Sequence, residues 1–507
     1  MTNTADQNIQ PPLPQQPLRQ RGLNGALRTP SVWPKWFSKY PIAVYLLALG
    51  AVTLLYSSHS LPWYYILSGV VAVLAFFLYG SKAVKDLAPN RIKKEKNFEK
   101  KIFTIAFVPR LVTMLLIYIV FQANYGNAFG FESGDALFYQ DLGVFVSGLL
   151  EDGNLHLYDE ITKWGNVDVS DMGYGIYMGF VYWLTGNSII IMRLLKCMWS
   201  ALTVVLIYRL AKRNFGEQTG RMAAIFCALW PNFWYYSSVH LKETEMLFLG
   251  VLFVEQSDQM LRSRQFTAWK VAPVLLIAAA IFTFRTPLGL VALLALVFSV
   301  VMSSSKVVNW GKRIIVGVLA VLLIGVTMGN RIEEQARQML KTVQTDDQHR
   351  NMEWRSVREH GNKFAKYAGA SVFAPMIFTL PFPTLAQAYE GQNMQMILNG
   401  GNFVKNIISC FTIMAMVVLL MSGKWREHLL PLSFMLGYLV VLVFSSFAQA
   451  ERFHQPAMPF ELMFAAYGLS IAITKPKYKR WFSYWCGVMF VAALAWNWFK
   501  LAGRGML

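Results

Sequence analysis

Charged residues that could take part in group transfer stand out in a chain that is otherwise strongly apolar. Acidic residues, Asp141 among them, lie between aromatic and glycine residues in the run FESGDALFYQDLGVFV, residues 131–146. Read as a helix that begins near residue 134, this run places Asp135 on one stripe with Tyr139 and Leu142. The helix dipole favours an ionised carboxylate at that end, as a general base requires. A simple N-cap role for Asp135 is an equally open interpretation.

A second charged group lies in SSVHLKETEMLFL, residues 237–249, where one apolar block ends and the next begins. Lys242 could neutralise a phosphate. Glu243 or Glu245 could serve as a second acid or as a metal ligand, and Asp141 is a further candidate for that role. The alternative is that these residues form ion pairs whose long side chains reach the membrane interface.

Two arginines complete the set of candidate residues. Arg285, in FTFRTPLG, has no acidic neighbour in sequence, and an unpaired arginine near the bilayer edge is costly unless it finds an anion. Arg452 lies in AERFHQPAMPFELMF, residues 450–464, beside Glu451 and His454. The guanidinium of Arg285 could bind a lipid headgroup or a substrate phosphate, and that of Arg452 could bind a substrate phosphate. The group around Arg452 could equally be an ordinary polar cap on a membrane span.

The composition indicates the elements that must position these residues. Of 507 residues, 55% are hydrophobic and 15% are charged. The apolar residues come in blocks of roughly 17–25 residues, the length of a membrane-spanning helix. We therefore expect an all-α polytopic membrane protein. The net charge of +19 resides mostly in short connectors, as in cytosolic loops that meet anionic membrane lipids, and it does not indicate a nucleic-acid partner.

The order of apolar and polar segments predicts a bundle of about 11–13 transmembrane helices with two extracytoplasmic loop regions that carry interfacial helices. The four cysteines lie far apart in apolar blocks and predict neither disulfides nor a zinc site. The expected divisions are a disordered cytosolic tail, an N-terminal hairpin with a basic loop, a catalytic transmembrane module, a second outer loop region and C-terminal helices. These span residues 1–41, 42–101, 102–329 (with the first outer loop at 122–187), 330–403 and 404–507.

Several motifs, in a fixed order, resemble the GT-C superfamily of membrane glycosyltransferases, in particular the protein O-mannosyltransferases and the lipid A aminoarabinose transferase. An acidic loop with D-A-x-x-Y (135–139) is followed by GYGIYMGFVYWLTG and by a span from R-L-L to Y-R-L-A-K-R-N-F-G (193–216). A charged outer turn comes next, and R-F-x-x-P-x-x-P (452–459) comes late in the chain. The resemblance covers residues 102–300 and, more loosely, 440–474.

The resemblance implies a GT-C-type bundle and inverting transfer of a sugar from a polyprenyl-phosphate donor to an acceptor hydroxyl on the extracytoplasmic face. It gives Asp135 the role of catalytic base, and it places Arg285 and Arg452 near the cations that bind the donor phosphate. The chain departs from the family's pattern in two places. Ala136 follows Asp135 where relatives often have a second acid, and the second outer turn reads Lys-Glu-Thr-Glu. These departures leave dependence on a divalent cation, Mg²⁺ or Mn²⁺, open.

Other functions remain compatible with the sequence. A polysaccharide polymerase or ligase that uses diphosphate-linked donors would work through region 330–403, where Arg350, Arg355, Arg358 and His360 cluster. A lipid-glycan flippase or transporter would need polar residues lining several spans, and an inactive scaffold of the same fold is a third alternative. The acceptor could be a protein, a lipid or a glycan. We expect the chain in a bacterial inner (plasma) membrane.

Overall fold

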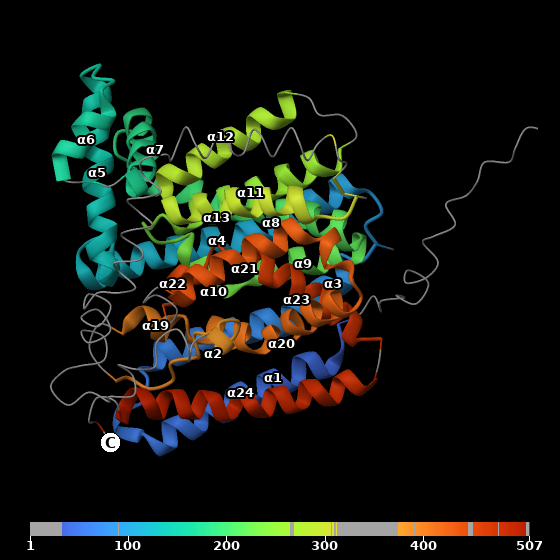
Figure 1. Cartoon of the computed structure of the whole chain (residues 1–507). Coiled ribbons are helices and arrows are strands. Elements are labelled where there is room, and N and C mark those ends of the chain that lie inside the picture. Colours follow the sequence, from blue (N-terminus) through green and yellow to red (C-terminus); the bar gives the residue numbers. More distant parts are fainter. Residues whose placement is uncertain are drawn as a thin grey trace, which may run out of the picture.

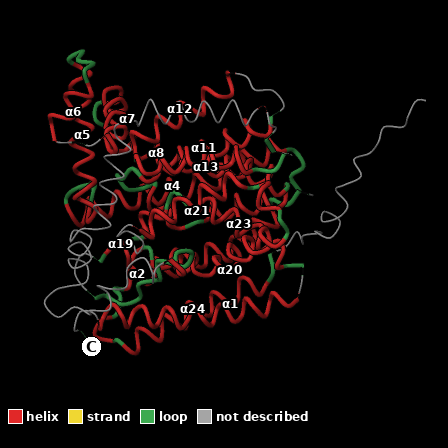
Figure 2. The backbone as a smooth tube through the Cα atoms, viewed as in Figure 1, coloured by secondary structure: helices red, strands yellow, loops and turns green. Residues whose placement is uncertain are grey.

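Helices form the architecture throughout the part of the chain that the structure describes. The computed structural model describes residues 33–89, 91–165, 167, 169–263, 268–305, 307–308, 311, 374–388, 392–444, 450–474, 476–502 and 506. Within these ranges the one pairing of extended backbone is an isolated bridge between Ser60 and Ala386, and no strand is present. Figure 2 shows the same helical composition. The expected all-α fold class is confirmed.

Six helical segments in the described residues are long and apolar enough to cross a membrane. They are α1 (Lys35–Leu55), the continuous segment formed by α2 (Trp63–Leu74), η2 (Ala75–Tyr79) and α3 (Gly80–Asp86), α4 (Glu95–Tyr125), α8 (Ile189–Phe215), α20 (Asn399–Met421) and α24 (Pro476–Ala502). Four shorter apolar helices accompany them, namely α12 (Ala268–Phe284), α13 (Thr286–Met302), α21 (Leu429–Phe444) and α23 (Met458–Ala472). A further apolar block of the sequence, residues 313–329, lies outside the described residues. The chain is a multi-pass membrane protein.

The short helices gather at one end of the bundle. At the left of Figure 1 lie α5 (Ser133–Glu151), α6 (Leu157–Gly165), α7 (Val169–Thr185), α10 (Pro231–Tyr236), α19 (Asn393–Ile397) and α22 (Glu451–His454). Helix α3 and helix α9 (Glu217–Leu229) mark the other end, and α11 (Glu243–Arg262) runs between the two. The acidic first loop and the basic connector after α3 therefore lie at opposite ends, as charge segregation across a membrane predicts.

Glycines in α7 explain the motif GYGIYMG. A Cβ on Gly175 would collide with the side chain of Leu142 on α5, and a Cβ on Gly179 would collide with Val146. Helix α7 also packs against α12. Small residues at these positions let the helices approach closely, so α7 holds α5 against the bundle.

The amino-terminal boundary lies earlier than residue 41, where the sequence analysis ends a disordered tail. Helix α1 begins at Lys35, and Trp33 and Phe37 are fully buried. Their rings contact Phe226, and Phe37 also contacts Phe411. Aromatic rings contribute a large buried area per residue, so two of them suffice to anchor this segment. That prediction was therefore wrong for residues 33–41, whereas residues 1–32 lie outside the described ranges.

The proline-rich end of the 330–403 region forms no regular α-helix over residues 374–388. After a short 3₁₀ turn at Ala374–Met376 the chain runs extended and mostly buried to residue 388. Asn497 on α24 accepts hydrogen bonds from the backbone N–H groups of Leu385 (2.7 Å) and Ala386 (3.1 Å) and donates one to the carbonyl of Pro383. Irregular backbone inside a membrane protein needs such partners. Residues 330–369, in the first part of this loop region, lie outside the described residues.

Candidate active site

Helix α5 presents Asp135 at the end of the bundle where the short helices gather. Tyr139, Leu142 and Val146 are buried, so the predicted stripe of α5 is the face that packs on its neighbours. Asp135 is the third residue of the helix and its side chain is 61% exposed. The carboxylate therefore stands at the solvent-facing end of an otherwise buried stripe, within the first turn rather than at the cap position.

Arg452 connects this carboxylate to a second one. From the short helix α22 it donates Nη1 to Oδ2 of Asp135 and Nε to Oε1 of Glu243 at the start of α11. Glu243 is 1% exposed and Arg452 is 13% exposed. Burial opposes the charge on Arg452, but Glu243 and Asp135 outweigh it and raise the pKa of the guanidinium above its usual value. Arg452 thus stays charged while it bridges one exposed and one buried carboxylate.

Lys242 forms a second ion pair beside this bridge. Its Nζ donates to Oδ1 of Asp171 in the first turn of α7 and to the carbonyl of Phe284 at 3.0 Å. Tyr139 donates its hydroxyl to the same oxygen of Asp171 at 3.2 Å. Burial lowers the pKa of Lys242 despite the nearby Asp171. The pair ties α5, α7 and α11 together directly beneath the exposed carboxylate.

Lys196 and Glu245 form a third pair deeper in the bundle. Their charged atoms are 2.7 Å apart, and the side chains are 0% and 5% exposed. Lys196 lies on α8 and also donates to the carbonyl of Leu241, in the turn before α11. A pair enclosed this fully is positioned to fix the start of α11 rather than to meet a substrate.

Arg285 lies between α12 and α13 and is half-buried. Its guanidinium stacks over the ring of Phe453, 4.8 Å from the centroid. The described part of the chain supplies no ion pair or hydrogen bond to this side chain. Among the cations at this end, Arg285 therefore retains the most capacity to bind an incoming anion.

Helix α22 is held from two further sides. Glu451 accepts hydrogen bonds from Asn232 (2.7 Å), Tyr236 and Gln455. His454 contacts Lys405 on α20 through Nδ1 at 2.7 Å. Because Glu451 and His454 are anchored by other elements, the short helix between them holds Arg452 in a fixed position.

Comparison with known proteins identifies the class of protein that carries this site. The family model described as dolichyl-phosphate-mannose-protein mannosyltransferase matches residues 174–328. Over this segment the chain is similar to that family. No curated protein and no solved structure matches the chain. The resemblance to GT-C membrane glycosyltransferases is confirmed, and the chain is a glycosyltransferase that uses a lipid-phosphate sugar donor.

The matched segment covers only part of the site of this glycosyltransferase. Residues 174–328 contain Lys196, the charged start of α11 and Arg285. Asp135 lies before this segment in the sequence and Arg452 lies after it. Both come into contact with the matched residues only through the folding of the chain.

The structure brings together most of the candidate residues. Lys242, Glu243, Arg452 and Asp135 belong to adjoining ion pairs, and Arg285 contacts Phe453 of α22. Asp141 is exposed on α5, and no ion pair joins it to any described residue. It lies six positions after Asp135, on a different face of the helix. Arg350, Arg355, Arg358 and His360 lie outside the described residues.

Two residues of the site escaped the sequence analysis. Asp171 lies in the first turn of the glycine-rich helix, and Lys196 interrupts the apolar block of α8. A lysine within a membrane span normally has a partner or a function, so its position was a usable signal. Arg193, near the start of α8, is fully buried and donates Nη2 to the carbonyl of Ala128 at 2.6 Å.

The carboxylates that the structure describes in this glycosyltransferase are not arranged as a divalent-cation site. Among the described residues no group of three His, Cys, Asp or Glu side chains converges on a common point. Asp135, Glu243 and Asp171 are each directed at a basic side chain instead. This donor set does not fit Mg²⁺ or Mn²⁺, which prefer several convergent oxygen ligands, and no step proposed below uses a metal.

Proposed function

We propose that this glycosyltransferase moves a sugar from a polyprenyl phosphate to an acceptor hydroxyl at the extracytoplasmic end of the bundle, with inversion and with Asp135 as the base. The contact between Asp135 and Arg452 carries the proposal. Residues 317 positions apart meet there, so one surface presents a carboxylate next to a guanidinium. A base for the acceptor and cations for the departing phosphate can therefore be presented to one substrate from the same surface.

The reaction is a single displacement. The acceptor oxygen forms a bond to the anomeric carbon on the face opposite the phosphate, while the bond from that carbon to the phosphate oxygen breaks. The hydroxyl proton passes to an oxygen of Asp135, and general-base assistance of this kind contributes typically about 10²–10⁴-fold. The polyprenyl phosphate leaves with the electron pair of the broken bond. The oxygen that had joined it to the sugar therefore carries one additional negative charge.

Cations near Asp135 favour that departure. Arg285 and Arg452 would bind the phosphate oxygens, because one has no ion-pair partner among the described residues and the other is 13% exposed. Lys242 is 4% exposed and would act from beneath through its positive charge. Fixed charges that face the leaving group stabilise it without reorganisation during the reaction.

Buried charges in the bundle bear on the transporter alternative. Arg110, Lys196, Lys405 and Glu461 are all buried. The last three lie near the first turns of α8, α20 and α23, at the same end as Asp135. Arg110 is enclosed by Ser200 and by three backbone carbonyls. Glu255 and Asp258 are buried as well, near the other end of α11, where Arg213 pairs with both. The buried charges among the described residues are thus held in ion pairs and hydrogen bonds at both ends of the bundle.

A donor panel tests the proposal. Purified protein in lipid nanodiscs would receive polyprenyl-phosphate and polyprenyl-diphosphate sugars together with peptide, lipid and glycan acceptors. We expect turnover of monophosphate donors only, and a product of inverted anomeric configuration. Turnover of diphosphate donors that depends on Arg355 and not on Asp135 would replace the proposal with the polymerase or ligase. Separation of bacterial inner and outer membranes, followed by detection of the protein in each, would test the expected location in the inner membrane.

A further inference from the structure

A polar cavity lies at the end of the bundle opposite to Asp135. It has a volume of about 390 Å³ and is formed where α13 ends and where the 3₁₀ turn η5 (Lys424–Glu427) links α20 to α21. Its walls are the last residues of α13, the serines 303–305, Gly423, Arg426 and Glu427. Nothing in the transfer reaction uses this cavity, because Arg285 lies at the start of α13 and the cavity lies at its end. Figure 1 shows how α13 runs through the bundle.

The walls of the cavity are held in place from behind. Arg262 on α11 donates Nη2 to the carbonyl of Glu427 at 2.6 Å, and the N–H of Ser304 donates to the carbonyl of Arg426 at 3.1 Å. His428 contacts Asn214 at 2.9 Å through Nδ1. The turn that carries the two charged side chains is thus fixed to both α11 and α13.

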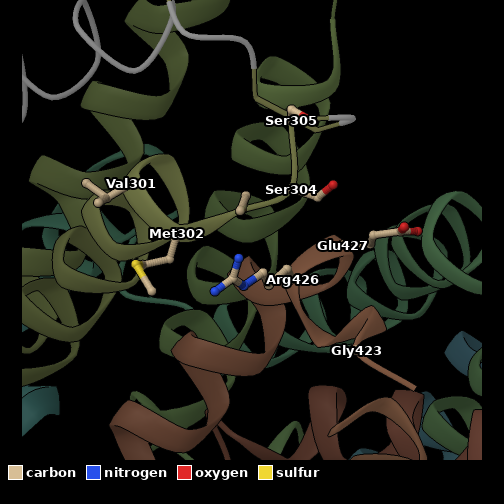
Figure 3. Close-up of a pocket in the computed structure, with 8 residues that line it drawn as sticks. Val301, Met302, Ser304, Ser305, Gly423, Arg426 and Glu427 are labelled. Atoms are coloured by element: carbon tan, nitrogen blue, oxygen red, sulfur yellow. The ribbon is translucent and has the colours of Figure 1, made fainter. Parts of the chain in front are cut away.

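The two charges lie at opposite sides of the cavity. Figure 3 shows the guanidinium of Arg426 extending towards Met302, while the carboxylate of Glu427 extends the other way, on the side of the Ser304 hydroxyl. Arg426 stacks on the ring of Trp425 at 5.3 Å, and the described residues supply no carboxylate partner for it. A ligand that spans the cavity would meet a cation at one end and an anion at the other.

The cation side of the cavity opens onto the membrane. Val301 is 54% exposed and lies on the last turn of α13, beside Met302. Leu420 and Met421, at the end of α20, are 59% and 85% exposed. Exposed apolar residues at the end of a span face acyl chains, and an aromatic ring such as Trp425 is typical of the headgroup level. The cavity therefore opens where lipid tails meet lipid headgroups.

We propose that this cavity binds the headgroup of a glycerophospholipid that carries a primary ammonium group, as phosphatidylethanolamine does. The phosphate would lie on Arg426, the ammonium would donate to Glu427 and to the Ser304 hydroxyl, and the acyl chains would run along Val301. Glu427 disfavours a purely anionic headgroup. A quaternary ammonium has no N–H to donate. This inference is independent of the proposed function, since it concerns another end of the molecule.

Native mass spectrometry of the full chain, titrated separately with phosphatidylethanolamine, phosphatidylcholine and phosphatidylglycerol, tests the proposal. We expect the unmodified protein to bind phosphatidylethanolamine several-fold more tightly than the other two. Arg426→Gln should weaken that binding on the order of tenfold, the effect of losing one charge-assisted hydrogen bond. Glu427→Gln should abolish the preference for the primary ammonium.

The control is Lys424→Ala, which removes a cation from the same turn without touching the cavity wall, and it should bind as the unmodified protein does. Equal binding of the three lipids to the unmodified protein would overturn the proposal, and that comparison does not depend on any variant folding. Binding by Arg426→Gln that equals the unmodified protein would also overturn it. Transferase activity is not the readout, so failure of the proposed function would leave the result intact.

Discussion

Arg452 donates one nitrogen to Asp135 and another to Glu243, so a single guanidinium on α22 connects the start of α5 with the start of α11. Asp135, at the exposed end of this bridge, is available to an acceptor, whereas Glu243, at the other end, is buried. Positioning and chemistry therefore depend on the same side chain.

Replacement of Arg452 by glutamine should abolish transfer and also destabilise the fold. Glu243 would be left buried without a cation, and breaking a buried pair costs about 3–5 kcal/mol. Thermal unfolding in detergent and donor turnover measure the two effects. The double variant Arg452→Gln/Glu243→Gln should regain most of the stability but no activity. Recovery of activity in the double variant would show that Arg452 only holds the fold together.

Replacement of Arg285 by alanine should raise the KM for the donor about tenfold, as loss of one charge-assisted contact to phosphate predicts. Stability should change little, because the ring of Phe453 is the one contact described for this guanidinium. The control is Arg91→Ala, which removes one arginine at the opposite end of the bundle and should leave the KM for the donor unchanged. An unchanged KM in the Arg285 variant would remove this residue from the phosphate site.

Removal of both members of the deep pair tests whether Glu245 is a second acid. Lys196→Met alone should destabilise the protein strongly, because Glu245 would remain buried and unpaired. Lys196→Met/Glu245→Met should restore the melting temperature and leave turnover per folded molecule nearly unchanged. Loss of turnover in a stable double variant would instead place Glu245 in the reaction.

Stability should fall between mildly acidic and neutral pH because of Glu451. Burial raises the pKa of this carboxyl from 4.5 to about 7. The folded state then binds more protons than the unfolded state, so the stabilising contribution is complete below about pH 4.5 and is lost as the pH rises through 7. The melting temperature of the unmodified protein should decrease from pH 5 to pH 8, and that of Glu451→Gln should decrease less. Parallel curves for the two proteins would contradict this assignment.

Much of the fold could be predicted because apolar blocks of membrane length leave few alternatives. The stripe through Tyr139 and Leu142 was predictable for the same reason, since periodicity marks a buried helix face. The start of α1 was not, because its anchor consists of isolated aromatic rings whose partners lie hundreds of residues away.

The candidate site could be predicted only as a set of residues and not as pairs. The sequence places Lys242 beside Glu243, yet Lys242 pairs with Asp171 and Glu243 pairs with Arg452. Which side chains on different helices form pairs depends on how the bundle packs. The types and spacing of residues along one sequence do not reveal that packing. The burial of Arg193 escaped prediction for the same reason, since its position near a helix end is equally compatible with exposure to headgroups.

The central claim is tested most directly by turnover of a polyprenyl-phosphate sugar by Asp135→Asn, measured beside Asp141→Asn. Both carboxylates are exposed on α5, so neither change should disturb the fold. We predict that Asp135→Asn lowers turnover at least about 10²-fold, as loss of a general base requires, while Asp141→Asn stays close to the unmodified protein. Normal turnover by folded Asp135→Asn would contradict the account.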